Sequence, residues 1–367
     1  MKKLLILLAF TAVVACGNAS EEAEIQEIPI EIQEIEQESA SEISRSLEVE
    51  EIEEVAKIGE ISKNVEYISI AGEQFSTDLT SLNLHNRGLT DITPLAYMVN
   101  LESLSLAENQ ITDISPLAGL TNLRELRLEF NEIADLTLLV GLVNLEWLVL
   151  QHNQISDISP LAELANLELL QLDFNQISDL APLANLHLSL LSLGFNQITD
   201  ISPIHAESLR TLSLPGNKIS DILPLIAAVQ LIDLDLTQNQ ISDISPLAGL
   251  EFLGNLALSN NPIADITGLA GLNVYWLILD DAQISDLSPL STLHNLRRLE
   301  MYRNRISDIS PLAGLENLNV LLLGGNEISE ISPLANMQNL QMLDLTDNLI
   351  TDWSPLDNLS PNLLLAR

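Results

Sequence analysis

The side chains best suited to catalysis or metal binding are spread thinly along this sequence. No two of the five histidines have the spacing of a metal-binding pair, and the single cysteine, Cys16, lies far from them. The sequence contains no HExxH, no GxSxG and no glycine-rich phosphate loop. We therefore predict no catalytic residue, no metal and no cofactor, and expect a protein that is not an enzyme. The five histidines are His85, His152, His187, His205 and His294.

Acidic residues recur at a nearly constant interval between Asp91 and Asp352. There are thirteen of them, and only Glu330 is not aspartate. If successive units stacked as coils, these carboxylates would lie about 4.8 Å apart and could bind calcium. The alternative is that each one accepts a hydrogen bond from a backbone amide in a turn, as aspartate often does outside helices. We favour the turn interpretation.

These acids belong to a repeat that covers most of the chain. The motif LxxLxLxxNxI occurs thirteen times, and its asparagine position recurs every 22 residues, or every 21 in three places. Asparagine fills that position in eleven copies, and Arg87 and Ala282 replace it in the other two. In "LRELRLEFNEI" (residues 123–133) the leucines have the alternation of a short strand that faces inward, with Glu125 and Arg127 outward. The asparagine amide can bond to backbone groups between adjacent coils.

A second signal follows each asparagine at a fixed distance. Proline lies seven positions after it in eleven of the thirteen copies, and serine or threonine comes before that position in eleven, as in Ser115-Pro116. A hydroxyl can cap a helical turn, and proline suits the first helical position. The pattern predicts a short helical turn on the outer face, capped by the serine hydroxyl.

The thirteen copies together resemble the 22-residue class of bacterial leucine-rich repeat proteins, the internalin type, from residue 65 to about 360. The resemblance implies an α/β solenoid, a horseshoe with a parallel β-sheet on the concave face and short 3₁₀ turns on the convex face. It also implies binding on the concave sheet. We assign residues 65–367 to this domain of about 13 repeats. The immunoglobulin-like domain and cell-wall sorting tail of that class have no counterpart in the sequence.

The first residues have the character of an export signal. "MKKLLILLAFTAVVAC" has two lysines and then an apolar run that is too short to span a membrane. Its last four residues resemble the lipobox of bacterial lipoproteins, which implies a signal peptide over residues 1–15 and acylation of Cys16. An ordinary secretory signal is the alternative. Since Gly17 rather than aspartate follows the cysteine, the resemblance implies residence at the outer membrane, with surface exposure as one orientation.

Residues 16–64 differ abruptly from the repeats. Between residues 17 and 64 there are 15 glutamates and three basic residues, so this segment repels itself and extends as an acidic tether. Apolar residues between Ile43 and Ile58 fall near helical spacing. This part could therefore instead form a short helix that caps the end of the array. The net charge of −37 excludes nucleic acid and anionic lipid as partners, so we expect membrane contact through the lipid anchor only.

If the repeated residues form the frame, binding specificity must come from the outward positions that vary. Seven of the ten aromatic residues between positions 80 and 360 occupy such positions. Phe130, Phe174 and Phe195 come directly before the asparagine in repeats three, five and six, with His152 at that place in repeat four. Trp147 and Val149 lie on the adjacent strand. We predict an apolar binding surface here; the alternative is that the phenylalanines pack over the strand ends.

A second group lies where the repeat is irregular. It contains Tyr275, Trp276, Ile278 and Tyr302, beside Arg298 and Arg303 in the most basic part of the array. We expect an acidic partner group to dock there. The irregularities nearby are Ala282, in place of asparagine, and Gly268, in place of proline. They mark either a functional site or drift.

These patterns together predict a monomeric cell-envelope lipoprotein that binds a protein or glycan partner through its concave face. Adhesion to a host surface is one such role. A structural scaffold that faces the periplasm and organises envelope proteins is the alternative.

Overall fold

The computed structural model describes residues 65–367. The predicted signal peptide, the lipidation site Cys16, the acidic tether and the capping helix expected between residues 43 and 58 all lie outside the described residues.

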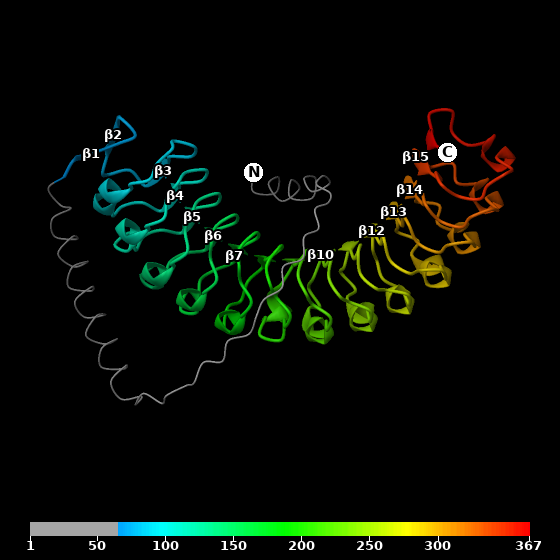
Figure 1. Cartoon of the computed structure of the whole chain (residues 1–367), viewed down its shortest axis with the longest axis horizontal. Coiled ribbons are helices and arrows are strands. Elements are labelled where there is room, and N and C mark those ends of the chain that lie inside the picture. Colours follow the sequence, from blue (N-terminus) through cyan, green and yellow to red (C-terminus); the bar gives the residue numbers. More distant parts are fainter. Residues whose placement is uncertain (1–64) are drawn as a thin grey trace, which may run out of the picture. The chain divides into compact units, whose positions relative to one another are not determined.

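Fourteen short parallel strands form one sheet in sequence order, which confirms the predicted solenoid (Figure 1). Each strand pairs with the same positions of the next repeat, so that Leu126 lies opposite Leu148. Strand β16 begins a fourteenth copy. The strands are β3 (Ser81–Asn83), β4 (Ser103–Ser105), β5 (Glu125–Arg127), β6 (Trp147–Val149), β7 (Leu169–Gln171), β8 (Leu190–Ser192), β9 (Thr211–Ser213), β10 (Asp233–Asp235), β11 (Asn255–Ala257), β12 (Trp276–Ile278), β13 (Arg298–Glu300), β14 (Val320–Leu322), β15 (Met342–Asp344) and β16 (Leu364–Ala366).

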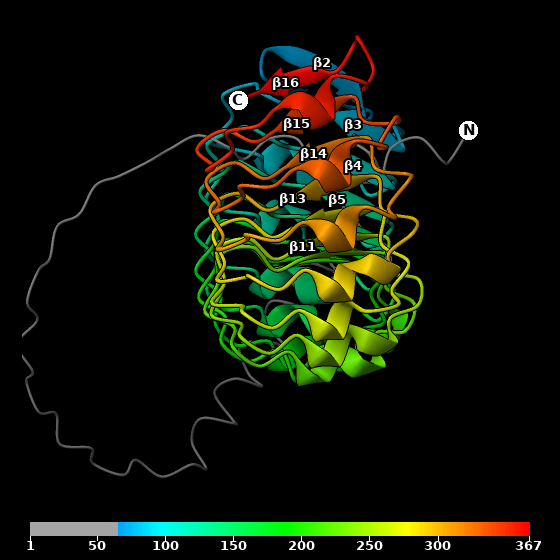
Figure 2. The same ribbon diagram turned by 90° about the vertical axis from the view of Figure 1, so that its right-hand side faces the viewer.

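A 3₁₀ turn follows each strand from β3 to β15 and lies on the outer side of the coils, where successive turns stack one above another (Figure 2). Within residues 65–367 no helix is long and apolar enough to cross a membrane. The turns are η3 (Thr93–Tyr97), η4 (Ser115–Leu117), η5 (Thr137–Gly141), η6 (Ser159–Leu161), η7 (Ala181–Leu183), η8 (Ala206–Ser208), η9 (Leu223–Ala227), η10 (Ser245–Gly249), η11 (Thr267–Leu269), η12 (Ser288–Thr292), η13 (Ser310–Leu312), η14 (Ser332–Leu334) and η15 (Ser354–Leu356).

The start of every turn except η8 is stabilised by the repeated acid and not by the serine hydroxyl. In repeat six the Asp200 carboxylate bonds to the Ser202 N–H, and the 3₁₀ turn begins only at Ala206. At η4 the residue before the turn is Ile114, and no side chain caps it. The Asp113 carboxylate accepts a hydrogen bond from the backbone N–H of Ser115 at 2.8 Å. The predicted serine cap is therefore wrong, and the turn interpretation of the aspartates is confirmed, because the carboxylate reaches the free amide two residues ahead.

Two kinds of side chain hold the coils together. Leucine and isoleucine fill one continuous core along the array, most of them fully buried. The asparagine of each repeat bonds to the backbone of its own coil and of the coil before it. The Asn175 Oδ1 accepts from the Ile155 N–H at 3.0 Å, while its Nδ2 donates to the carbonyls of Leu150 and Leu172 at 3.0 Å. The predicted structural role of asparagine is confirmed.

The amino-terminal end of the array is covered by a hairpin that the repeat pattern did not predict. Strands β1 (Tyr67–Ile70) and β2 (Glu73–Ser76) pair antiparallel around Ala71 and Gly72, both of which have positive φ. Ile68 and Ile70 are buried against the core of the first coil. Residues 65–76 therefore close the end of the array and do not form a repeat of their own.

Candidate functional site

The residue before each asparagine position has a left-handed backbone. Its φ lies between 51° and 72° in all thirteen repeats, Phe130, Phe174 and Phe195 included. This conformation costs a residue with a side chain roughly 1–2 kcal/mol, whereas glycine adopts it freely and asparagine often does. Other repeats have Asn260 or Gly216 at this place. Phenylalanine is thus an unfavourable choice for the backbone, and a different interaction must compensate.

The four residues Phe130, His152, Phe174 and Phe195 form a stack that we call the aromatic ladder. Successive ring centroids are 4.1, 4.1 and 4.4 Å apart, with interplanar angles of 11–13°. Stacked pairs contribute about 0.5–1.5 kcal/mol each beyond their buried area, which offsets much of the backbone strain. The structure therefore brings together the four residues that the sequence had placed at one position of successive repeats.

The two inner rings of the ladder, His152 and Phe174, present their edges, because the rings on either side cover their faces. Phe130 is 48% exposed and Phe174 is 37% exposed. Phe195 is half-buried because its ring lies over Gly216, where a Cβ atom would be 2.6 Å from the Phe195 Cδ1. Sugars usually bind aromatic residues by stacking on free ring faces. Covered faces and free apolar edges suit the side chains of a protein better.

Trp147, on β6, has the exposed outward position that the alternation predicts, with 46% of its surface exposed. Val149, two residues later, lies between Arg127 and Gln171 on the neighbouring strands and is only 9% exposed. Val149 therefore offers almost no surface to a partner, which corrects its assignment as a contact residue.

Charge beside the ladder is controlled by burial. Burial raises the pKa of Asp173, although its carboxylate accepts hydrogen bonds from the Ser192 hydroxyl at 2.7 Å and the Gly194 N–H at 2.8 Å. Burial also lowers the pKa of His152, and the Asp173 charge opposes that shift only partly. Both shifts favour the uncharged form of the side chain, which suits an apolar surface at the ladder.

The second predicted group is divided between exposed and engaged side chains. Tyr275 and Trp276 are exposed, and Ile278 is half-buried. Tyr302 lies over Gly324, and its hydroxyl donates to the Asp344 carboxylate at 2.8 Å. Tyr302 is therefore held within the concave face.

The arginines of this group are paired within the chain. Arg298 forms an ion pair with Glu300, and Arg303 forms one with Asp281. The Arg297 guanidinium lies over the Tyr275 ring at 5.9 Å. To bind an acidic group of a partner, Arg298 and Arg303 would first have to break these ion pairs. The predicted docking of an acidic group here therefore has less support than the sequence suggested.

The irregular repeat has a packing cause. A Cβ atom at Gly268 would lie 2.6 Å from the carbonyl oxygen of Ile244 on the preceding coil, so a larger residue does not fit. At Ala282 the side chain packs against the core, and the Ile263 N–H donates to the Asn261 carbonyl at 2.8 Å in place of an asparagine side chain. The close approach of the preceding coil explains Gly268, and the backbone bond of Ile263 replaces the asparagine contact at Ala282.

Known structures identify the family. An internalin, inlF, from Listeria monocytogenes is 35% identical, with a TM-score of 0.77, over 85% of this chain and 93% of that one. The chain belongs to the internalin family of leucine-rich repeat proteins. A family whose description is "Leucine Rich repeats (2 copies)" also matches the chain, at residues 99–140, 143–185, 229–271 and 316–358. No curated protein sequence matches the chain.

More distant structures share the fold alone. The Leptospira interrogans leucine-rich repeat protein LIC12759 is 21% identical over 79% of this chain and 96% of that one, with a TM-score of 0.57. The Arabidopsis receptor kinase HAESA, in complex with the peptide hormone IDA and the co-receptor SERK1, is 23% identical over 77% and 52% of the two chains, with a TM-score of 0.64. Folds of this kind typically serve as binding scaffolds.

Histidine and acidic side chains lie on many coils of the internalin array. Among residues 65–367 no group of three or more histidine, cysteine or acidic side chains is placed to hold a metal ion. The structure does bring His187 and His205 together, with ring centroids 4.3 Å apart on neighbouring coils. The sequence did not predict this contact, because the two lie 18 positions apart in a region where the repeat is shortened.

One feature of the internalin array was present in the sequence and overlooked. Large side chains on the concave face lean over glycines of a neighbouring coil. Besides Phe195 over Gly216, Tyr302 lies over Gly324 and Tyr275 lies over Gly254. Glycine at a variable position, one repeat away from an aromatic residue, is the signal that could have indicated the direction in which each ring leans.

Asp280 should make stability depend on pH. Burial raises the pKa of Asp280 to about 6, from 3.8. The folded state therefore binds a proton that the unfolded chain releases between about pH 4 and pH 6, so this contribution to stability falls as pH rises through that window. Asp280→Asn should remove this pH dependence of stability, because an amide does not titrate. The amide oxygen can still accept the hydrogen bond that the Tyr302 N–H donates to Asp280 at 2.7 Å. Urea unfolding at both ends of the window checks this; an equal difference between variant and wild type at both pH values would contradict it.

Proposed function

We propose that this protein is a cell-envelope lipoprotein that binds a protein partner through the concave face of its internalin-type array. The observation that carries the proposal is the aromatic ladder together with Trp147, an exposed apolar surface on a strongly acidic array. Aromatic residues that lose water on binding contribute most of the affinity of many interfaces. Adhesion to a host surface is one role that this binding would serve.

The capture of partners by two forms of the full chain tests the binding surface. We expect wild type to retain a protein from host or envelope extracts that the triple variant Phe130→Asn, Phe174→Asn, Trp147→Ser does not retain. Asparagine suits the left-handed backbone at positions 130 and 174, so the variant should fold. Circular dichroism and thermal unfolding check that it does.

The matched control for capture is Tyr67→Ser, which removes an exposed aromatic side chain from the hairpin at the end of the array. The control should retain the same protein as wild type. Equal retention by the triple variant would move the binding site away from the ladder, and no specific retention by any form would favour the scaffold hypothesis.

The lipoprotein part of the proposal has its own test. We expect growth with a labelled fatty acid to label wild type and not the Cys16→Ser variant. Protease treatment of intact cells then distinguishes the two orientations, because only an array displayed on the surface would be degraded. An unlabelled wild-type protein would favour an ordinary secretory signal.

A further inference from the structure

The outer face of repeat seven carries an apolar row found in few other repeats. Leu223 and Ile226, on η9, are each 57% exposed, and Val229 just beyond the turn is also exposed. Leu223 and Ile226 are three positions apart, and a 3₁₀ helix has three residues per turn, so these two side chains line up on one side. Most repeats have serine or threonine where Leu223 lies and alanine where Ile226 lies.

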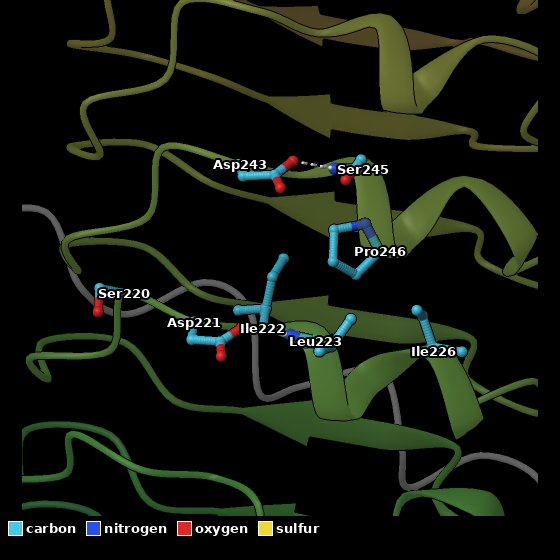
Figure 3. Close-up of a pocket in the computed structure, with 8 residues that line it drawn as sticks. All are labelled: Ser220, Asp221, Ile222, Leu223, Ile226, Asp243, Ser245 and Pro246. Carbon is cyan, nitrogen blue, oxygen red and sulfur yellow. Dashed lines mark hydrogen bonds between the residues drawn. The ribbon is translucent and has the colours of Figure 1, made fainter.

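The row borders a shallow hollow on the outer side of the array. Figure 3 shows Leu223 and Ile226 on η9 facing Pro246 of the next turn, with Asp221 and Asp243 beside them. The hollow has a volume of about 320 Å³, and no lysine or arginine of the described residues lines it. The structure thus places exposed aliphatic side chains and two exposed carboxylates at one site.

One carboxylate oxygen of Asp221 has no hydrogen-bond partner among the described residues. In repeat six the Ser202 hydroxyl donates to the Asp200 Oδ2 at 3.0 Å. Leu223 has no hydroxyl. Among the described residues, Asp221 accepts one hydrogen bond, from the backbone N–H of Leu223 to its Oδ1 at 2.8 Å. The second oxygen of Asp221 can therefore bond to a cation on a partner, directly beside the apolar row.

Further exposed apolar residues lie between the turns and the strands that follow them, in repeats seven and eight. Ile232 and Phe252 are exposed, and Phe252 lines a second hollow of about 340 Å³ together with Glu251, Asn273 and Tyr275. Exposed apolar side chains that gather in one part of a surface commonly mark a site of interaction.

We propose that the outer turn of repeat seven is a second docking surface, for a polypeptide segment that presents an apolar side chain flanked by lysine or arginine. Charge complementarity selects this occupant. Residues 65–367 contain 37 acidic and 10 basic residues, so a second copy of the array would be repelled. Residues 17–64, with 15 glutamates, and anionic lipid would be repelled for the same reason.

Direct binding to the full chain tests this surface. The probe is a short fluorescent amphipathic peptide built of leucine and lysine. We expect Leu223→Ser with Ile226→Ala to weaken its binding about tenfold, equivalent to about 1.4 kcal/mol, because the apolar row is lost. The variant carries the residues that most repeats have at these positions, so it should fold. Asp221→Asn should also weaken binding and reduce its dependence on salt.

Two comparisons keep the test specific. Val140→Ala removes an exposed aliphatic side chain at the equivalent place on η5 and should leave binding unchanged. The triple ladder variant should bind the peptide as wild type does, so failure of the proposed function and failure of this surface are distinguishable.

Several results would overturn the proposal. Equal peptide binding by wild type and Leu223→Ser, Ile226→Ala would show mere attraction of a polycation to the acidic array. Equal binding of a leucine–glutamate peptide would refute the role of charge. If wild type but not the variant binds phosphatidylcholine vesicles, the row would instead contact a lipid surface. If wild type but not the variant forms a dimer on gel filtration, the row would instead contact a second copy of the chain.

Discussion

Replacing Asn175 by alanine is expected to lower the free energy of unfolding by about 3 kcal/mol. The change would leave the buried Ile155 N–H without its acceptor. It would also remove one of the two asparagine donors to each of the Leu150 and Leu172 carbonyls, which Asn153 and Asn196 still contact. A buried donor left unsatisfied costs about 1–3 kcal/mol, and loss of the two carbonyl contacts adds to that cost. Urea unfolding followed by circular dichroism measures the loss.

Asn166→Ala is the matched control for that experiment. Asn166 is exposed and donates one hydrogen bond, to the Val143 carbonyl at 2.8 Å. We expect a loss below about 1 kcal/mol, since water can replace that donor. Similar losses for the two variants would mean that burial does not determine the strength of the asparagine contacts.

Introducing the consensus proline at Gly268 is expected to destabilise the array by about 2 kcal/mol, although eleven other repeats have proline at this place. The new Cβ would come within 2.6 Å of the Ile244 carbonyl oxygen and 3.0 Å of its carbon, and both are backbone atoms. Overpacking of this kind costs about 1–3 kcal/mol, because one coil must move relative to the next.

Leu138→Pro introduces the proline into the other repeat that lacks it, and here we expect no destabilisation. The Leu138 N–H makes no hydrogen bond to the described backbone, and Leu138 is part of η5, where proline is the common residue in other repeats. We expect a neutral change or a gain of up to about 1 kcal/mol. Thermal unfolding of both variants compares them, and equal destabilisation would show that Gly268 is not limited by space.

The strands, the turns and the asparagine contacts could be predicted because a repeated residue meets the same neighbours in every coil. The pattern around residues 123–133 fixes which side chains of β5 are buried, and the same argument transfers to every strand. The serine cap failed for a local reason. The Asp113 carboxylate reaches the Ser115 amide two residues ahead, and a sequence pattern alone does not show which of two neighbouring side chains reaches it first.

The parts that do not repeat were harder to predict. The hairpin at Ala71 and Gly72 occurs once, so no period indicates it. The aromatic ladder was placed correctly at one position of successive repeats, but its stacking depends on a left-handed backbone that only the structure shows. The pairing of Arg303 with Asp281 likewise depends on side chains one coil apart. Leu223 lies on an outer turn, away from the concave face where the family resemblance implies binding.

The register of the sheet has a consequence for how the chain folds. Each strand pairs with the strand one repeat away, about 22 residues earlier, and the core joins only neighbouring coils. Distant segments never have to meet, which keeps the entropic cost of loop closure small and uniform. The hairpin β1–β2 supplies the first covered surface, and each later coil can be added as soon as its residues emerge from the ribosome or a membrane pore. Growth in order of arrival would then leave only one unfinished edge exposed at a time.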